Sequence, residues 1–281
     1  MNSSPMDIDA AIKQASRLVQ EAEALLITAG AGMGVDSGLP DFRGTEGFWR
    51  AYPAIAKLGL RFEEMANPEW FQESPELAWA FYGHRLALYR KTVPHSGFQR
   101  LLANGGKKRL GYFVFTSNVD GQFQKAGFDP DRIVECHGSV HHFQCCQPCH
   151  KLIWDAAGES VVVDESKFSA RAPLPQCPDC RRTARPNVLM FGDYAWIPNR
   201  SHEQEFRLRT WLQLVKAERG KLVVIELGAG TAIPSVRILS SRVVNDDRAT
   251  LIRINPREPE VPPGQIGLPF GAEDGLRRIL N

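Results

Sequence analysis

The chain has 281 residues, of which 43% are hydrophobic and 23% charged, and its 34 basic residues nearly balance 32 acidic ones. These values are typical of a globular protein of one large or two modest domains and give no sign of a nucleic-acid or membrane partner. The segment 1–11 lacks a basic stretch followed by an apolar core, and no apolar run approaches the roughly 20 residues that span a bilayer. We therefore expect a soluble, cytoplasmic protein.

The first predicted elements are a helix and a strand. Hydrophobic residues recur at helical spacing from Ile8 to Val19, which predicts an amphipathic helix. The apolar run from Ala24 to Thr28 fits a strand buried on both faces of a parallel sheet. A glycine-bearing loop, residues 30–44, follows at the carboxyl end of this strand. Because glycines lack Cβ atoms, its backbone can approach a nucleotide diphosphate and direct N–H groups at the phosphates.

The loop does not form a full Gly-x-Gly-x-x-Gly fingerprint, and its glycines alone fit a tight turn equally well. The continuation from Pro40 to Arg43 is more specific, because it sets an acid, an aromatic ring and a guanidinium beside the glycines. Together the segment resembles the signature of the sirtuins (Sir2 family), which are NAD-dependent protein lysine deacylases. The family usually has Ser at Gly34, which predicts altered NAD affinity with retained binding. The resemblance implies these NAD contacts in the loop: Gly30, Ala31, Gly32, Asp41, Phe42 and Arg43.

Residues 45–102 contain no strand-like run, and their clustered aromatic residues and prolines predict an insertion of short helices. Within it, Tyr82 and Arg85 are three residues apart and share one helix face. In the sirtuin branch that removes acidic acyl groups, a Tyr-x-x-Arg pair reads the substrate carboxylate, a task that suits a phenol and a guanidinium. The pair fits equally well a core tyrosine beside a solvated arginine.

Polar side chains follow the second and third predicted strands. Ser117, Asn118 and Asp120 come after the strand 112–115, and His137 follows the strand 132–136. The carboxyl ends of parallel strands form the usual binding edge of an open sheet. By the resemblance, Ser117, in place of the usual Gln, lines a nicotinamide and ribose pocket with Asn118 and Asp120, and His137 is the general base. An imidazole suits this role, since its ordinary pKa is about 6.5.

Two close groups of cysteines, separated by the length of a small module, predict a tetrahedral structural zinc site. Adjacent cysteines seldom both ligate one ion, so we choose Cys145 over Cys146, although spacing alone leaves that choice open. Four thiolates leave no position for a reactive water, and the ion should hold the fold. Cys136 is expected to be a buried thiol. The predicted ligands are Cys145, Cys149, Cys177 and Cys180.

The segment after the cysteines predicts a fourth strand over 187–191. Sirtuins typically have Phe-Gly-Glu at its end, where the chain pairs with the substrate peptide like an added strand. The resemblance therefore implies that Phe191 and Gly192 bind the acylated-lysine peptide, with Asp193 in place of the usual Glu.

The last third predicts a helix over 206–215 and strands over 222–227 and 250–254. The family more often has Gly-Thr-Ser after the first of these strands, where this chain lacks both hydroxyls. The resemblance implies these ribose and adenine contacts: Gly228, Ala229, Gly230, Asn255 and Ala272.

Six strands separated by helices predict an α/β fold, a Rossmann-like open parallel sheet with helices on both faces. We assign residues 1–44, 103–138 and 186–281 to this NAD-binding domain. The helical insertion 45–102 and the zinc-binding module 139–185 form the expected smaller domain, and the substrate lysine should enter between the two.

The resemblance implies NAD-dependent removal of acetyl groups from protein lysines. The presence of Tyr82 and Arg85 implies that succinyl or malonyl groups are removed as well. The acyl oxygen attacks the ribose carbon that bears nicotinamide, and His137 then takes a proton from a ribose hydroxyl. The products are nicotinamide and O-acyl-ADP-ribose. Two alternatives remain open: ADP-ribosyl transfer or NAD hydrolysis in the same pocket, and a non-catalytic NAD or ADP-ribose sensor. Oligomeric state and protein substrates leave no signal in the sequence.

Overall fold

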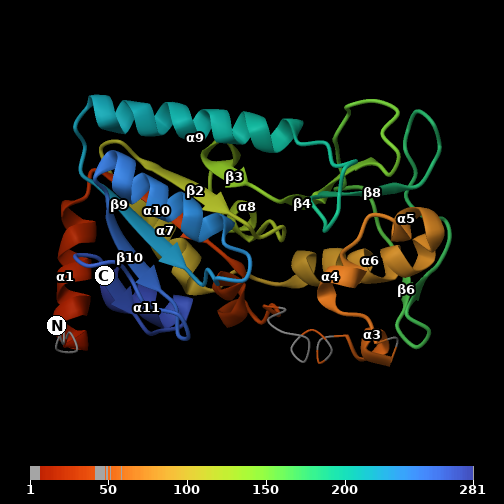
Figure 1. Ribbon diagram of the computed structural model, residues 1–281, viewed down its shortest axis with the longest axis horizontal. Coiled ribbons are helices and arrows are strands. Elements are labelled where there is room, and N and C mark those ends of the chain that lie inside the picture. The colour runs from red at the N-terminus through yellow and green to blue at the C-terminus, as the bar shows by residue number, and fades with distance from the viewer. Residues whose placement is uncertain (1–6, 42–47, 49, 51, 58, 281) are drawn as a thin grey trace.

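The computed structural model describes residues 7–41, 48, 50, 52–57 and 59–280. Phe42 and Arg43, two of the expected NAD contacts, lie outside these residues. A part built around a parallel sheet and a smaller part of helices and short strands lie toward opposite ends of the long axis (Figure 1). Within the described ranges, each helix is too short or too polar to cross a membrane.

The larger part contains a six-stranded sheet whose neighbouring strands are all parallel. In spatial order the strands are β11 (Ile266–Leu268), β10 (Thr250–Ile254), β9 (Leu222–Leu227), β1 (Ala24–Ala29), β2 (Tyr112–Thr116) and β3 (Ile133–Glu135). Chain order runs outward from β1 to β3 on one side and from β9 to β11 on the other. It therefore reverses between β1 and β9, and open α/β sheets bind ligands at the carboxyl ends of strands beside such a reversal.

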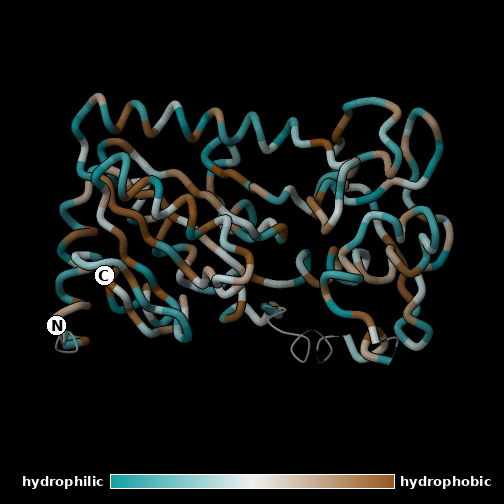
Figure 2. Tube along the Cα trace, in the orientation of Figure 1, coloured by the Kyte–Doolittle hydropathy of each residue, from teal (hydrophilic) through white to brown (hydrophobic). Residues whose placement is uncertain are grey.

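Helices cover both faces of this sheet, and hydrophobic residues concentrate along the strands between them (Figures 1 and 2). One face packs against α1 (Ile8–Glu21), α7 (Ser96–Gly105) and α11 (Ala272–Ile279), and the other against α9 (Asn199–Ala217) and α10 (Ser235–Asp247). Alternate residues of β1 enter the two cores, Leu25 and Ile27 on one face and Leu26 on the other. The predicted amphipathic helix and Rossmann-like sheet are confirmed.

The smaller part has a hydrophobic core of its own. Its strands are β4 (Gly138–Cys145), β5 (Trp154–Asp155) and β8 (Ala184–Val188), which form an antiparallel sheet, and the paired β6 (Val163–Asp164) and β7 (Ser169–Ala170). Its helices are α3 (Pro53–Lys57), α4 (Phe62–Met65), α5 (Trp70–Glu73) and α6 (Pro75–Lys91). The Trp79 ring packs edge to face against Phe71 of α5 and Phe143 of β4. The helical insertion and the cysteine-bearing segment therefore share one core.

The prediction of a fourth parallel strand over 187–191 is wrong. The chain forms β8 three residues earlier, and β8 pairs antiparallel with β4 in the small sheet. Leu189 and Phe191 follow β8 and are 39% and 41% exposed, whereas Met190 between them is 5% exposed and packs in the small core, so this apolar run lies at the edge of that core. The sixth parallel strand is instead β11, whose three residues carry too little periodicity to be recognised. The domain boundary predicted between 185 and 186 accordingly falls inside β8.

Candidate active site

Two glycine-bearing loops touch where the strand order reverses. The N–H of Gly30 donates to the carbonyl of Leu227 at 3.0 Å, and the N–H of Gly32 donates to that of Gly228 at 3.1 Å. A Cβ added to Gly32 would lie 2.7 Å from the Gly228 Cα, so only glycine allows this approach. The short 3₁₀ helix η1 (Ala31–Ser37) continues from this contact. The loops that follow β1 and β9 are thus brought together at the carboxyl edge.

The departure at Gly34 has a packing explanation. A Cβ at this position would approach Leu39 Cδ1 at 3.1 Å, which is tighter than ordinary van der Waals contact. The Ser that the family usually has would therefore require Leu39 to shift. In this chain the absence of a side chain at Gly34 leaves room for Leu39.

Asn118 is attached to the first glycine loop. Its Nδ2 donates to the Gly30 carbonyl at 3.0 Å, and its N–H donates to Thr116 Oγ1 at 3.0 Å. Thr116 Oγ1 in turn donates to the carbonyl of Ala29 at 3.0 Å. Through these bonds the ends of β1 and β2 hold Asn118 beside the expected NAD loop.

Asp120 lies just before α8 (Gln122–Lys125) and is only 9% exposed. Its Oδ1 accepts from the N–H of Gln122 at 2.9 Å, and its carbonyl lies 2.9 Å from His141 Nε2. Burial raises the pKa of Asp120 to about 6, and the nearby Glu135 carboxylate acts in the same direction. Asp120 is therefore a carboxylate at neutral pH that gains a proton in mildly acidic solution.

His137 is partly buried at the carboxyl end of β3, and its Nε2 lies 3.1 Å from Ser235 Oγ. Burial lowers its pKa, and a main-chain hydrogen bond with Ser117 opposes this effect. The ring is consequently neutral at pH 7, the state that a general base requires. The His137 carbonyl accepts from the N–H of Leu189 at 2.9 Å, which connects the histidine to the segment after β8.

The loop after β9 is held by Asn255 and by a charged pair that the sequence motifs do not reveal. The Ala229 carbonyl accepts from Asn255 Nδ2 at 2.9 Å and from Arg237 Nε at 3.0 Å. Arg237 Nη2 also donates to Glu258 Oε2 at 3.0 Å, and Thr231 Oγ1 donates to the other carboxylate oxygen at 3.1 Å. Asn255 and Arg237 therefore both hold the loop 228–230, and Glu258 is bound to this loop through Arg237 and Thr231.

The remaining end of the first loop meets the C-terminal helix. Asp36 Oδ2 accepts from the N–H of Glu273 at 2.8 Å, and Ala272, the first residue of α11, is 3% exposed. Asp41 Oδ2 lies 3.6 Å from Arg257 Nη1. Ala272 and Asp41 are thus brought to the same edge, with Ala272 packed beneath its surface.

Tyr82 and Arg85 both lie on α6 inside the smaller part, 1% and 6% exposed. The Arg85 guanidinium lies over the rings of Phe81, Tyr82 and Tyr89, with its Cζ 5.2, 5.6 and 5.4 Å from their centroids. Its Nε donates to Tyr89 Oη at 2.9 Å. The alternative of a solvated arginine is wrong, because the guanidinium is held in a buried aromatic enclosure.

The segment expected to bind peptide is exposed and fixed at its base. The N–H of Phe191 donates to the Ala66 carbonyl at 3.0 Å, and Gly192 has a φ of +66°. The side chains of Asp193 and Arg185 form an ion pair at 2.7 Å with neither exposed. Phe191 and Gly192 are therefore presented to solvent by a bend with a buried anchor.

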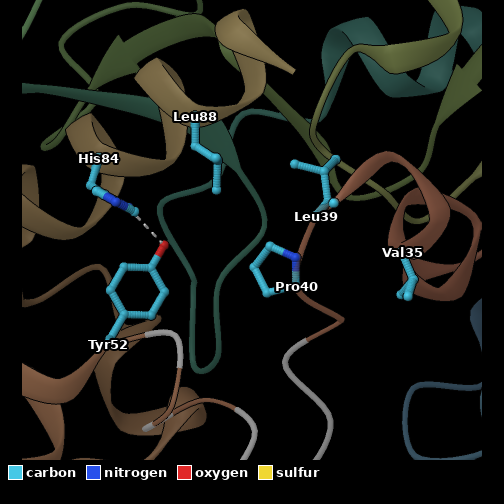
Figure 3. A pocket seen from close by; sticks show the side chains of 7 residues that line it. Val35, Leu39, Pro40, Tyr52, His84 and Leu88 are labelled. Atoms are coloured by element: carbon cyan, nitrogen blue, oxygen red, sulfur yellow. Dashed lines mark hydrogen bonds between the residues drawn. The ribbon is translucent and has the colours of Figure 1, made fainter. Parts of the chain in front are cut away.

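A pocket of about 370 Å³ lies between η1 and α6 (Figure 3). Its wall includes the pair His84 and Tyr52, whose Nδ1 and Oη are 3.3 Å apart. The complete lining is Val35, Gly38, Leu39, Pro40, Tyr52, His84 and Leu88. The pocket opens directly beside the expected NAD loop, between the two parts of the molecule.

The four predicted zinc ligands converge. The Sγ atoms of Cys145, Cys149, Cys177 and Cys180 all lie within 4.8 Å of one another. Cys146 is outside this group and packs into the small core, 6% exposed, which settles the choice that spacing left open. Four sulfur ligands in this arrangement fit tetrahedral Zn²⁺ with no open position. Cys136, expected to be buried, is partly buried, and burial raises its pKa to about 12.

The site as a whole is that of a nucleotide-binding α/β enzyme. Two glycine loops, a polar strand end and a neutral histidine meet at one edge of a parallel sheet, beside a pocket shared with a second part of the chain. The sequence motifs did not reveal Tyr89, Ser235, Arg237 or Glu258, because none of these residues belongs to a recognisable pattern and each is identified only by its contacts.

Comparisons with known proteins identify the family. The model of the Sir2 family matches residues 30–206. The chain is 30% identical over 243 residues to the "NAD-dependent protein deacylase" of Thermococcus kodakarensis, covering 86% of this chain and 83% of the relative. It is 28% identical over 277 residues to a protein of the same name from Thermus thermophilus, covering 96% and 94%. The chain belongs to the Sir2 family.

Comparison with solved structures supports the same family. A Sir2 homologue in complex with NAD aligns with a TM-score of 0.70 at 26% identity, covering 100% of this chain and 94% of that one. A mutant Sir2 homologue in complex with 2'-O-acetyl ADP-ribose aligns with a TM-score of 0.66 at 26% identity, covering 95% and 94%.

Proposed function

We propose that this Sir2 family member removes acyl groups from protein lysines in a reaction that consumes NAD and yields nicotinamide and O-acyl-ADP-ribose. The relatives named NAD-dependent protein deacylases support this reaction class. NAD and 2'-O-acetyl ADP-ribose bound to two similar structures support its substrate and product. One observation carries the proposal: the neutral imidazole of His137 lies at the same sheet edge as Asn118 and the two touching glycine loops.

NAD binds, in this proposal, across the reversal between β1 and β9. Its pyrophosphate lies against Gly30, Ala31 and Gly32, where missing Cβ atoms expose the backbone. The adenosine ribose lies near Asn255 and the loop 228–230, and Asn118 and Asp120 orient the nicotinamide end. NAD supplies a ribose carbon with a good leaving group, and the lysine amide oxygen is the nucleophile. The remaining predicted contacts are Asp41, Phe42, Arg43, Ser117 and Ala272.

His137 acts as the base. After nicotinamide has left, Nε2 of His137 takes the proton of a ribose hydroxyl. The ribose oxygen keeps the electron pair and attacks the acyl carbon with it. Two features support the assignment: burial keeps the ring neutral, and the Leu189 hydrogen bond holds it beside the proposed peptide segment. The peptide adds a strand along Phe191 and Gly192, which places its acyl-lysine between the two parts of the molecule.

An acidic acyl group, succinyl or malonyl, is the proposed preference. The buried guanidinium of Arg85 attracts a carboxylate more strongly than an arginine exposed to water does, because the local dielectric constant is low. The Tyr82 hydroxyl is buried without a hydrogen-bond partner among the described residues, which leaves it able to donate to such a ligand. Burial raises the Tyr82 pKa to about 12, so the phenol keeps its proton.

Structural zinc fits the four-cysteine group. Cys145, Cys149, Cys177 and Cys180 would hold the ion and join the end of β4 to the turn before β8. Because four thiolates leave no coordination position for a water molecule, the zinc ion would stabilise the fold of the small part.

The test is mass spectrometry of an acetylated or succinylated lysine peptide incubated with the protein and NAD. We expect deacylated peptide and O-acyl-ADP-ribose in equal amounts with the wild type, and neither with His137→Ala. Release of nicotinamide without acyl peptide would indicate NAD hydrolysis or ADP-ribosyl transfer instead. NAD binding with no product under any condition would indicate a sensor.

A further inference from the structure

Ser235 contacts the proposed base without belonging to any motif of the site. It is the first residue of α10, and its Oγ lies 3.1 Å from His137 Nε2. The N-cap of α10 is Pro234, so the serine hydroxyl does not cap this helix in the usual way. Its side-chain hydroxyl contacts His137 instead.

The two ring nitrogens of His137 can be assigned different partners. A main-chain hydrogen bond with Ser117 favours the protonated ring, as a bond donated to a carbonyl does. Because Nε2 faces Ser235, we assign this bond to Nδ1. A neutral ring with its hydrogen on Nδ1 carries a lone pair on Nε2, and the Ser235 hydroxyl can donate to that lone pair. The tautomer needed for a base at Nε2 is thus selected from both sides of the ring.

The position of Ser235 adds an electrostatic effect. It stands at the amino end of a helix of 13 residues, where the helix dipole is positive. A positive potential disfavours an imidazolium at this point, as burial of His137 does. The contact therefore keeps the ring both oriented and neutral before the reaction.

We propose that Ser235 passes the proton of the ribose hydroxyl to His137. The Ser235 hydroxyl gives its own hydrogen to the Nε2 lone pair, Oγ takes the hydrogen of the ribose hydroxyl in the same step, and Nδ1–H stays on the Ser117 carbonyl. The ribose oxygen keeps the electron pair for its attack on the acyl carbon. The inference rests on the proposed function, in which His137 is the base.

The test separates the step before His137 acts from the step that needs it. Exchange of labelled nicotinamide into NAD with an acetylated peptide reports the first step, and formation of O-acyl-ADP-ribose reports both. We expect Ser235→Ala to lower product formation roughly tenfold, the effect of losing one ordinary hydrogen bond, with exchange unchanged. Ser235→Thr, which keeps the hydroxyl, should restore product formation. Ser241→Ala, an exposed serine on the same helix, is the matched control.

The other outcomes overturn the inference in distinguishable ways. If Ser235→Ala lowers exchange and product formation equally, the serine is only structural. If it changes neither while His137→Ala abolishes product formation, the proposed function stands and Ser235 has no part in it. If His137→Ala forms product as fast as the wild type, the base is misassigned and both proposals fail.

Discussion

Arg185 and Asp193 form a bidentate ion pair that is fully removed from solvent. Nη1 lies 2.7 Å from Oδ2 and Nη2 lies 3.0 Å from Oδ1. Asp193 Oδ1 also accepts from the N–H of Ala195 at 3.1 Å. The pair therefore fixes the bend that carries Phe191 and Gly192 after β8, and the Asp that replaces the family's usual Glu is tied into the fold.

Replacing Asp193 by Ala should destabilise the protein by about 3–5 kcal/mol, because it leaves the Arg185 charge buried without its partner. Urea denaturation measures the free energy of unfolding. The control is Glu21→Ala, whose pair with Lys221 at 3.7 Å is exposed on both sides and should contribute less than about 1 kcal/mol. Similar small losses in both variants would contradict the buried pair.

Gly32→Ala should weaken NAD binding at least tenfold, roughly 1.4 kcal/mol. The reason is that its Cβ would lie 2.7 Å from Gly228 Cα and force the two loops apart. Isothermal titration calorimetry with NAD measures the dissociation constant. Gly158→Ala is the control, since no atom lies within 4 Å of a Cβ at that position. Unchanged affinity in the Gly32 variant would place the cofactor elsewhere.

The pH dependence of kcat/KM should show an acid limb below about pH 6.5, the ordinary pKa of histidine. Burial lowers the His137 pKa from that value, so the base is neutral at higher pH and is lost as the pH falls through its pKa. Asp120, whose pKa burial raises to about 6, loses its charge in the same direction.

The rates of the wild type and Asp120→Asn with an acetyl peptide are measured across this acid range. They separate the titration of His137 from that of Asp120, because the acid limb due to His137 persists in the variant. A limb centred above the ordinary histidine pKa would be inconsistent with a buried His137.

Arg85→Met should lower kcat/KM for a succinyl peptide more than tenfold and leave an acetyl peptide within a few fold, since only the former loses a charge-assisted hydrogen bond of roughly 1.5–3 kcal/mol. Arg90→Met is the control on the same helix, because its guanidinium donates to the carbonyls of Ala156 and Glu159 at 2.6 Å. That change should affect both peptides alike. Equal turnover of succinyl peptide by the wild type and Arg85→Met would rule out the acidic preference.

Zinc should be lost from Cys149→Ser and retained by Cys146→Ala. Cys149 Sγ lies 3.7 Å from Cys177 Sγ within the four-cysteine group, whereas Cys146 packs in the small core. Elemental analysis of the purified variants measures the bound metal. Chelation of the wild type should unfold the small part, because the binding free energy of a structural zinc is folding free energy. Zinc loss from the Cys146 variant would mean that the ligand register is different.

Local patterns were sufficient for the elements that carry the family signature. The helix over Ile8–Glu21 and the strand over Ala24–Ala29 follow from periodicity and from an apolar run, and paired spacing identified the cysteine groups. The same reasoning misplaced the strand near 187–191, because an apolar run that is only partly exposed has the composition of a buried strand. Ile266–Leu268 was too short for any pattern to distinguish it.

The sequence by itself determined the family, the parallel sheet and the identity of most residues that gather at its edge, since motif spacing and hydrophobic period are local properties of the chain. Only the tertiary structure decided which of them meet and in what state. Burial, a long-range property, makes His137 neutral and encloses Arg85 in aromatic rings, and Ser235 reaches the imidazole across 98 positions of sequence. Such contacts arise where strands far apart in the chain end side by side, and no local pattern records them.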